Sequence, residues 1–232
     1  MKQHRFFGTF DFSVTPMVIT DSLLVYQMKR VLRMQPGDSC ILCSYDGVCM
    51  LGTLNSFIKE TAEFSIHDRV ETADADMPDI VLYCAILKRE NFEWVVQKAT
   101  EIGATSIVPL ITVRTIKQSL KRDRLEKIIR EAAEQSQRSH VPLMQDPQEI
   151  STLLAHPLAG THIAYDPLGS SQKPVYRDAI THIYIGPEGG WDHTEISAFR
   201  KAGVALHSLG RLILRAETAA VVATYEAVTH HL

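Results

Sequence analysis

The chain has 232 residues, of which 45% are hydrophobic and 22% charged, and its formal net charge is −3. This length fits one large domain or two small ones, and the composition is that of a globular protein able to bury a core. No apolar run is long enough to cross a bilayer, the N-terminus lacks a signal-peptide core, and the net charge argues against coating nucleic acid through bulk charge. We therefore expect a cytoplasmic protein with no membrane segment.

Residues 1–72 have the pattern of a small β-barrel made of short strands. A turn at Pro36-Gly37-Asp38 precedes an apolar strand over 39–45, and Asp46-Gly47 has hairpin-turn chemistry before a returning strand over 48–54. Several strands at this spacing favour a barrel.

One helix is expected to interrupt the barrel, from about Asp21 to Leu32. Its apolar face holds Leu24, Val25, Met28, Val31 and Leu32. The basic residues near its end either complement the helix dipole or contact RNA backbone, and they are Lys29, Arg30 and Arg33.

The four cysteines are Cys40, Cys43, Cys49 and Cys84. Cys40 and Cys43 have CxxC spacing, but no second pair or histidine cluster lies nearby, which argues against a zinc site. We expect buried, reduced thiols and no metal.

The polar, acidic stretch at 73–79 is the predicted linker, and a second domain is expected over 80–232. There, apolar strands at 80–87, 106–111, 161–165, 182–185 and 204–209 alternate with helices, including one over 92–102 with Gly103 as its C-cap and one over 122–139. This alternation predicts an α/β domain with a buried parallel sheet. Ligands of such sheets bind beyond the carboxyl ends of the strands, where the loops at Asp166-Pro167, Gly186–Gly190 and Leu209-Gly210 fall.

The loop Gly186-Pro187-Glu188-Gly189-Gly190 follows a strand, and Asp192 and Glu195 have the capping-box spacing that starts a helix. A Gly-rich turn before a helix N-terminus suits a nucleotide-like ligand, although many structural turns share these features.

Residues 88–138 are locally basic, with eleven Lys and Arg against seven Asp and Glu, a net +4. The patch either meets phosphates or is a solvated helix face with salt-bridge partners.

Five ordered segments carry a resemblance to the ribosomal small-subunit methyltransferase E family, a branch of the SPOUT methyltransferases. They are Val31-Leu32-Arg33 with Pro36-Gly37-Asp38; the QKATEIG run over 97–103 with Pro109-Leu110; EAAEQS over 131–136 with Arg138 and Val141-Pro142; IGPEGG over 185–190; and LGRLILRAETAA over 209–220.

The resemblance implies an N-terminal PUA-like RNA-binding barrel and a C-terminal SPOUT domain whose deep trefoil knot forms the cofactor site. Topology rules alone would predict an unknotted sheet. The implied reaction moves a methyl group from S-adenosylmethionine to N3 of a uridine in 16S rRNA of the small ribosomal subunit. Such a reaction needs alignment and removal of the N3 proton more than elaborate chemistry.

The implied cofactor residues are glycines that allow close approach of the backbone, apolar walls that could instead be ordinary core, and their neighbours: Gly186, Pro187, Gly189, Gly190, Leu209, Gly210, Ile213, Leu214 and Thr218.

Glu188 and Arg215 are the candidate catalytic residues. Glu188 orients the cofactor or accepts a proton from uracil, unless it is a turn carboxylate that assists the helix start. Arg215 holds a phosphate or the oxygen charge that builds as N3 is deprotonated, unless it pairs with Glu217 or Glu188.

The expected RNA contacts are Arg30, Arg33, Lys88, Arg89, Lys98, Arg114 and Arg138. The sequence departs from the family pattern at Gln27, Gln137, His140 and Leu212.

We expect a homodimer paired through the last segment, with Val221, Val222, Tyr225 and Val228, although this segment could equally pack on its own sheet. The rival interpretations are a SPOUT enzyme acting on transfer RNA or a ribose hydroxyl, and a non-catalytic RNA-binding protein. A nucleotide hydrolase is disfavoured because no GxxxxGK[ST] motif is present.

Overall fold

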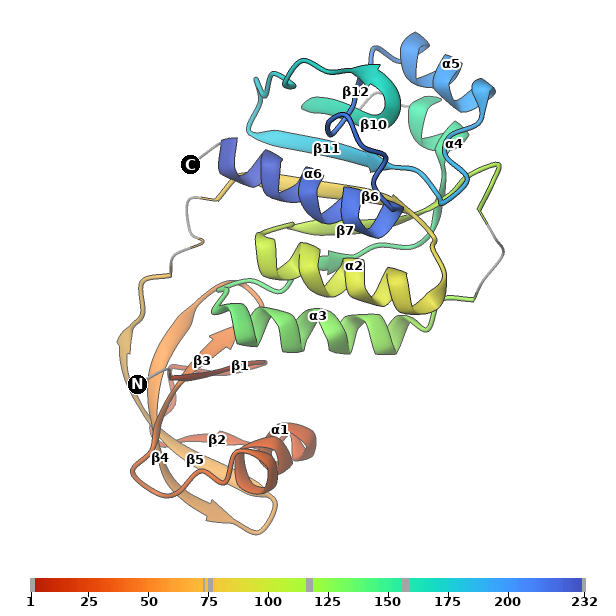
Figure 1. The fold of residues 1–232 in the computed structure, drawn as a ribbon. Helices are drawn as coiled ribbons and strands as arrows, with labels where there is room; N and C mark the ends of the chain where they lie inside the picture. Colours follow the sequence, from red (N-terminus) through yellow and green to blue (C-terminus); the bar gives the residue numbers. More distant parts are fainter. Residues whose placement is uncertain (1–2, 73, 75–76, 116–118, 156–158, 231–232) are drawn as a thin grey trace. The chain divides into compact units, whose positions relative to one another are not determined.

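The computed structural model describes residues 3–72, 74, 77–115, 119–155 and 159–230 (Figure 1). The chain divides into two compact units. The N-terminal unit comprises Met1–Ala75 and Ala133–Val141, and the C-terminal unit comprises Asp76–Ala132 and Pro142–Leu232. Of the predicted linker over 73–79, positions 73, 75 and 76 lie outside the described residues. The sequence did not single out 133–141 as part of the N-terminal unit.

The N-terminal unit is built on a curled, mixed five-stranded sheet with the order β1-β3-β4-β5-β2. Its strands are β1 (His4–Gly8), β2 (Met17–Ile19), β3 (Ser39–Ser44), β4 (Cys49–Ile58) and β5 (Thr61–Arg69). β1 runs parallel to β3, and the other neighbours are antiparallel. Phe6, Leu42, Leu54 and Phe64 form the centre of its core.

The predicted helix of this unit is present but changes character half-way. Asp21 caps α1 (Ser22–Tyr26), and the chain continues as the π-helical turn η1 (Gln27–Val31). Leu24 and Met28 are buried as predicted, whereas Val31 is 63% exposed. The prediction was wrong at Val31 because π-helical hydrogen bonds widen the turn, so the 3.6-residue spacing no longer holds.

The cysteine prediction was wrong for one pair, since Cys43 and Cys49 form a disulfide. The Asp46-Gly47 turn brings β3 and β4 into a register in which these two residues lie directly opposite each other. Their Cα atoms are 4.1 Å apart. Cys40 and Cys84 are buried free thiols, and no cluster of three or more His, Cys, Asp or Glu suited to a metal occurs among the described residues.

The C-terminal unit contains the predicted parallel sheet, with the order β12-β10-β11-β6-β7-β8 and β9 pairing with β7. Every neighbouring pair in it is parallel. The strands are β6 (Asp79–Ala85), β7 (Ser106–Ile111), β8 (Leu143–Met144), β9 (Gln148–Glu149), β10 (Thr161–Ser170), β11 (Ile180–Ile185) and β12 (Ala205–His207).

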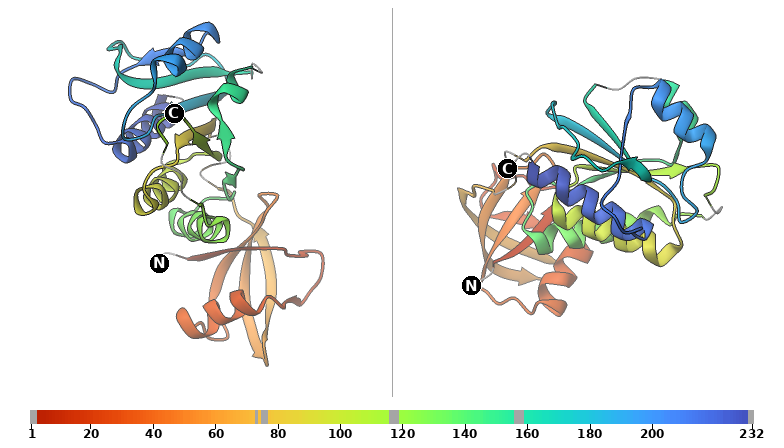
Figure 2. Two further views of the ribbon diagram at one scale, coloured as in Figure 1. Left: turned by 90° about the vertical axis from the view of Figure 1, so that its right-hand side faces the viewer. Right: turned by 45° about the horizontal axis from the view of Figure 1, so that its top comes forward.

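The helices of this unit cover both faces of the sheet (Figure 2). They are α2 (Arg89–Ile102), α3 (Arg122–Ser136, whose last four residues group with the N-terminal unit), α4 (Ile150–Ala155), α5 (His193–Lys201) and α6 (Ala216–His230). α2 and α6 lie side by side on one face, and α6 also contacts β6 and β11. α4 and α5 pack together on the other face, over Tyr83 and Tyr184 of the sheet, and Phe199 of α5 meets the Tyr184 ring edge-on. In the described part of the chain no helix is long and apolar enough to span a membrane.

The amphipathic patterns correctly predicted the inward faces of α2 and α3, and Leu125, Ile129 and Ala132 of α3 are buried. Phe92, Val95 and Val96 of α2 are buried, and Gly103 ends that helix with φ 133°. Consecutive side chains of each strand point to opposite faces of the sheet. Because helices cover both faces, the sheet is buried on both sides.

Candidate functional site

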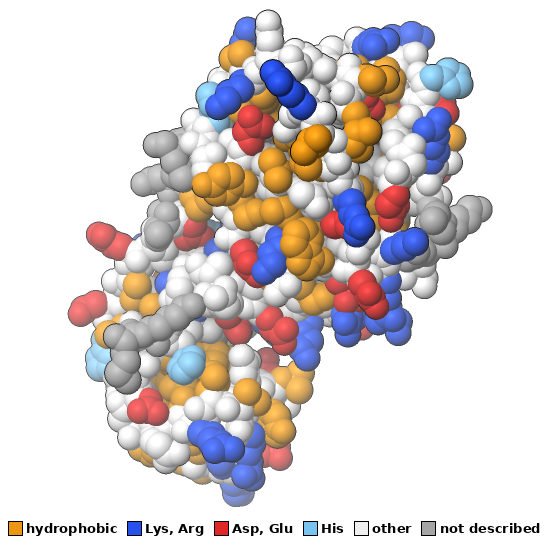
Figure 3. Space-filling view, in the orientation of Figure 1, with side chains coloured by type: hydrophobic (Ala, Val, Ile, Leu, Met, Phe, Trp, Pro, Cys, Tyr) orange, Lys and Arg blue, Asp and Glu red, His pale blue; other side chains and the backbone are white. Residues whose placement is uncertain are grey.

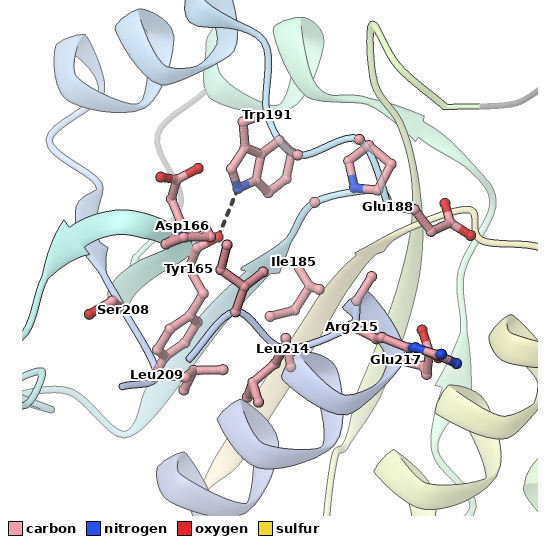
Figure 4. A pocket seen from close by; sticks show the side chains of 18 of the residues that line it. Tyr165, Asp166, Ile185, Glu188, Trp191, Ser208, Leu209, Leu214, Arg215 and Glu217 are labelled. Atoms are coloured by element: carbon pink, nitrogen blue, oxygen red, sulfur yellow. Dashed lines mark hydrogen bonds between the residues drawn. The ribbon is translucent and has the colours of Figure 1, made fainter. Parts of the chain in front are cut away.

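Three stretches of chain, one within β10 and the loops after β11 and β12, meet at one edge of the sheet and line a cavity of about 950 Å³ (Figure 4). The first is the stretch at Asp166-Pro167, which lies within β10 (Thr161–Ser170), immediately after this strand stops pairing with β11 at Tyr165. The second is Gly186–Gly190, directly after β11, and the third runs from Ser208 to Arg215 into α6. The sequence correctly predicted that all three stretches lie at this edge, as expected for a parallel sheet. It was wrong to end the first strand at Tyr165, because β10 continues to Ser170, where it pairs with β12.

Trp191 forms a wall of this cavity that sequence reasoning missed. The indole Nε1 donates a hydrogen bond to the carbonyl oxygen of Tyr165 at 2.9 Å, and the side chain is 5% exposed. It meets Phe199 edge-on at 4.9 Å. The indole therefore ties the loop after β11 to Tyr165 of β10. The sequence signal that could have revealed this role is the position of Trp191 directly after Gly190, the last residue of the glycine loop.

Several glycines of the loops are required by the fold itself. A Cβ on Gly186 would lie 3.1 Å from the Trp191 ring. Gly190 and Gly210 have φ of +69° and +134°, conformations that side chains rarely adopt. Gly189 has neither constraint, because a Cβ there would meet only the Arg114 side chain, at 3.4 Å from its Cδ and 3.7 Å from its Cβ. Gly186, Gly190 and Gly210 can therefore be explained without a ligand that approaches the backbone closely, and only Gly189 cannot.

The glycine loop is held by hydrogen bonds among five residues that we call the Glu195 latch: Val113, Arg114, Gly189, Asp192 and Glu195. Glu195 is 3% exposed, and its carboxylate accepts the backbone N–H of Val113 at 2.9 Å and of Asp192 at 2.7 Å. Arg114 Nη1 donates to the carbonyl of Gly189 at 2.8 Å. The latch joins the segment after β7 to the start of α5.

The predicted capping box at the start of α5 is confirmed, with Asp192 as N-cap and Glu195 closing the box. The backbone N–H of Thr194, followed by its hydroxyl, lowers the pKa of Asp192 to about 2. His193 and Arg114 lie within ion-pair distance of the same carboxylate, at 3.1 Å and 3.4 Å.

One side of the cavity is charged. Lys88, Asn91, Glu188, Arg215 and Glu217 line it, and Figure 4 shows the side chains of Glu188, Arg215 and Glu217 together there. The Lys88 backbone N–H donates to Glu188 Oε1 at 3.3 Å. Among the described residues the exposed Arg215 forms no ion pair, so the alternative of a salt bridge to Glu217 or Glu188 is not what the structure has.

The remaining walls are mostly apolar, with Tyr165, Ile185, Leu209 and Leu214 around the centre (Figure 4). Ile213 lines the same cavity and is 82% exposed, so it is not ordinary core. Thr218, expected at the cofactor, is half-buried on α6 and is not among the lining residues.

Comparison with known proteins places the chain in a family. A family model for RNA methyltransferase domains matches residues 75–227. The ribosomal RNA small subunit methyltransferase E of Synechocystis is 34% identical over 209 residues, which cover 86% of this chain and 68% of that protein. The chain belongs to the small subunit methyltransferase E family. The Bacillus subtilis member is 31% identical over 86% of this chain and 84% of its own.

A solved structure from the methyltransferase E family has the same fold. It is the Neisseria gonorrhoeae enzyme bound to S-adenosyl methionine, with a TM-score of 0.90 and 28% identity over 99% of this chain and 98% of that one. The α/β architecture with a parallel sheet is thus that of the family.

The basic residues expected to contact RNA in a methyltransferase E occupy different environments. Arg30 and Arg33 are exposed in the N-terminal unit, Lys88 lines the cavity, and Arg114 belongs to the Glu195 latch. Arg89 pairs with Glu93 at 3.1 Å and Lys98 with Glu101 at 2.8 Å, which is what the solvated-face alternative predicted for them.

Arg138 requires a correction, because it is 5% exposed and cannot line an RNA face. It lies within the N-terminal unit, 3.6 Å from the Asp74 carboxylate. Burial lowers the pKa of its guanidinium.

Three of the four departures from the family pattern have hydrogen-bond partners in the N-terminal unit. Gln27 donates to the Glu134 carboxylate at 3.1 Å. Gln137 adopts φ 64° and donates to the Glu134 carbonyl, and His140 bonds Ser139 at 2.7 Å. Leu212, the fourth, lines the cavity.

Proposed function

We propose that this chain uses S-adenosylmethionine to methylate N3 of a uridine in 16S rRNA of the small ribosomal subunit. The observation that carries the proposal is the cavity formed by three stretches of chain at one edge of the sheet, in a chain whose family includes a structure bound to this cofactor. The same cavity disfavours the non-catalytic alternative, because a protein that only binds RNA does not need a pocket that combines apolar walls with a cluster of charged side chains.

The walls fit the proposed cofactor. Tyr165, Leu209 and Leu214 offer apolar surface for an adenine ring, and the glycine loops expose backbone donors and acceptors without a Cβ. Two carboxylates, Glu188 and Glu217, line the charged side and complement a sulfonium. When bound, the cofactor supplies an electrophilic methyl group, and the protein's task is alignment.

The charged side of the cavity is where we expect the target uracil. Arg215 has no competing ion pair among the described residues, so its guanidinium is available to stabilise the negative charge on a uracil oxygen as N3 loses its proton. Glu188 either accepts that proton or orients the cofactor, and its contact with the Lys88 backbone N–H holds the carboxylate at the site in both cases.

The finer features of the fold belong to the same proposal. After β12 at the sheet edge, the chain returns through 208–215 so that α6 packs on β11 and β6, which lie two and three strands in from β12. That crossing supports a trefoil knot. The curled five-stranded sheet of the N-terminal unit supports a PUA-like barrel that holds RNA through Arg30 and Arg33. Val222 and Tyr225, 38% and 60% exposed on α6, support pairing of two copies there.

The test combines binding with product analysis. Calorimetry with S-adenosylmethionine should give saturable binding, and reaction with unmethylated small subunits should yield N3-methyluridine by nucleoside mass mapping. Arg215→Ala should abolish methylation while cofactor affinity stays within a few-fold. The matched control is Arg211→Ala, an exposed arginine of the same loop that does not line the cavity and should remain active.

The outcomes separate the rivals. A methylated ribose or a methylated transfer RNA would indicate another SPOUT activity, and absence of cofactor binding would indicate a non-catalytic RNA-binding protein. Loss of cofactor binding in Arg215→Ala would move that residue from the target nucleotide to the cofactor.

A further inference from the structure

A second hollow of about 710 Å³ lies beside the cavity, and nothing in the proposed reaction uses it. It is bounded by the end of β10 over 166–170, by α5, and by Val204 and Leu206 near the sheet edge. Arg114, Asp166 and Trp191 line both spaces, so the two are neighbours that share one wall. We call it the α5 hollow.

The floor of the α5 hollow is apolar. Val204 is 6% exposed, and Ile196 and Leu206 are half-buried beside it. On the lip stands Leu168, whose side chain is 95% exposed. A leucine that protrudes next to an apolar floor contributes little to folding, and a ligand that covers both would bury it.

The basic side chains at the rim of the α5 hollow differ in whether they contact an acidic residue. Arg114 and His193 both contact the Asp192 carboxylate, and Asp166 accepts the backbone N–H of Leu168 at 2.8 Å. Arg200 is exposed on the last turn of α5 and, among the described residues, has no acidic partner. Figure 3 shows Lys, Arg and His side chains gathered with hydrophobic ones over α5.

We propose that the α5 hollow holds a nucleotide adjacent to the target uridine, with its base on the apolar floor and its phosphate at Arg200. The inference rests on the proposed function, because a target base drawn into the cavity leaves its neighbours in the RNA unstacked, and the α5 hollow adjoins that cavity. Unstacked bases bind apolar and aromatic surfaces, and cationic side chains hold the connecting phosphates. The apolar floor can bind an unstacked base, and the Arg200 guanidinium, which has no acidic partner among the described residues, can hold its phosphate.

The test uses the full-length chain, S-adenosylmethionine and unmethylated small ribosomal subunits. Arg200→Ala should raise the KM for subunits about tenfold and reduce the slope of log KM against log salt by about 0.7 to 0.9, as expected for one lost phosphate contact. Leu168→Ala should raise KM without changing that slope. Cofactor affinity by calorimetry should not change in either variant.

Lys201→Ala is the matched control, because Lys201 is exposed on the same turn of α5 but does not line the hollow. A photoreactive benzoylphenylalanine at position 168 should crosslink to rRNA within a few nucleotides of the methylated uridine. The proposal is overturned if Arg200→Ala behaves like Lys201→Ala, or if the crosslink forms only to ribosomal protein. Absence of methylation by the unaltered chain would instead refute the proposed function itself.

Discussion

Replacement of Trp191 by phenylalanine tests whether the indole holds the cavity together. The chain has two tryptophans. Trp191 is 5% exposed and bonds the Tyr165 carbonyl, whereas Trp94 is 41% exposed on α2 and makes no such bond. Trp94→Phe is therefore a control with the same chemical change at a position without the constraint.

The structure sets the expected size of the effect. Trp191→Phe removes the donor to the Tyr165 carbonyl, which costs about 1–3 kcal/mol when the acceptor is left unsatisfied in a buried site. The smaller ring also leaves space beside Phe199 and Gly186, which adds about 1 kcal/mol. The free energy of unfolding should fall by about 2–4 kcal/mol, and a chain of this size then loses about 5–15 °C in Tm.

Urea unfolding and calorimetry with S-adenosylmethionine measure the two consequences. We expect Trp191→Phe to lose stability and to bind the cofactor at least about tenfold more weakly, because the loop after β11 is no longer tied to β10. Trp94→Phe should change the free energy of unfolding by less than about 0.5 kcal/mol. Equal effects of the two substitutions, or unchanged cofactor affinity in Trp191→Phe, would refute the reasoning.

Three further predictions follow from local geometry. Gly210→Ala should lower the free energy of unfolding by about 1–3 kcal/mol, because Gly210 has a φ of +134° that alanine rarely adopts. Gly189→Ala should be tolerated. If urea unfolding shows that the two variants lose equal stability, the prediction is contradicted. The pKa of Asp192 is lowered from 3.8 to about 2 in the folded chain, so its charge contributes stability above pH 4 that is lost as the pH falls toward 2. Relative to Asp192→Asn, which keeps a cap but does not titrate, the advantage of the original chain in urea should shrink over that interval, and a constant difference would be inconsistent with it. Alkylation of the denatured, unreduced chain should modify Cys40 and Cys84 alone, and all four cysteines after reduction; four modified before reduction would rule out the disulfide.

Local signals in the sequence predicted local structure well. Asp192 and Glu195 are three residues apart, and the capping box they form needs nothing from elsewhere in the chain. The apolar spacing of α2 and its glycine stop are equally local. The three stretches at the sheet edge followed from strand alternation, because parallel strands bring their carboxyl ends to one side.

Features that depend on distant residues were missed. The Glu195 carboxylate reaches Val113, 82 positions away, and no short motif encodes that contact. Arg138 resembled a surface cation until Asp74 and the surrounding packing buried it. The partner of Cys43 is decided by hairpin register, whereas CxxC spacing directed attention to Cys40, three positions earlier on the same strand.

The most direct test of the account is a cofactor titration in the Trp94→Phe variant, which leaves Trp191 as the only tryptophan, in the wall of the cavity. S-adenosylmethionine should change the Trp191 fluorescence saturably, with the same dissociation constant as calorimetry gives. Binding heat without any change at Trp191 would put the cofactor elsewhere, and absence of both signals would contradict the methyltransferase function proposed for this cavity.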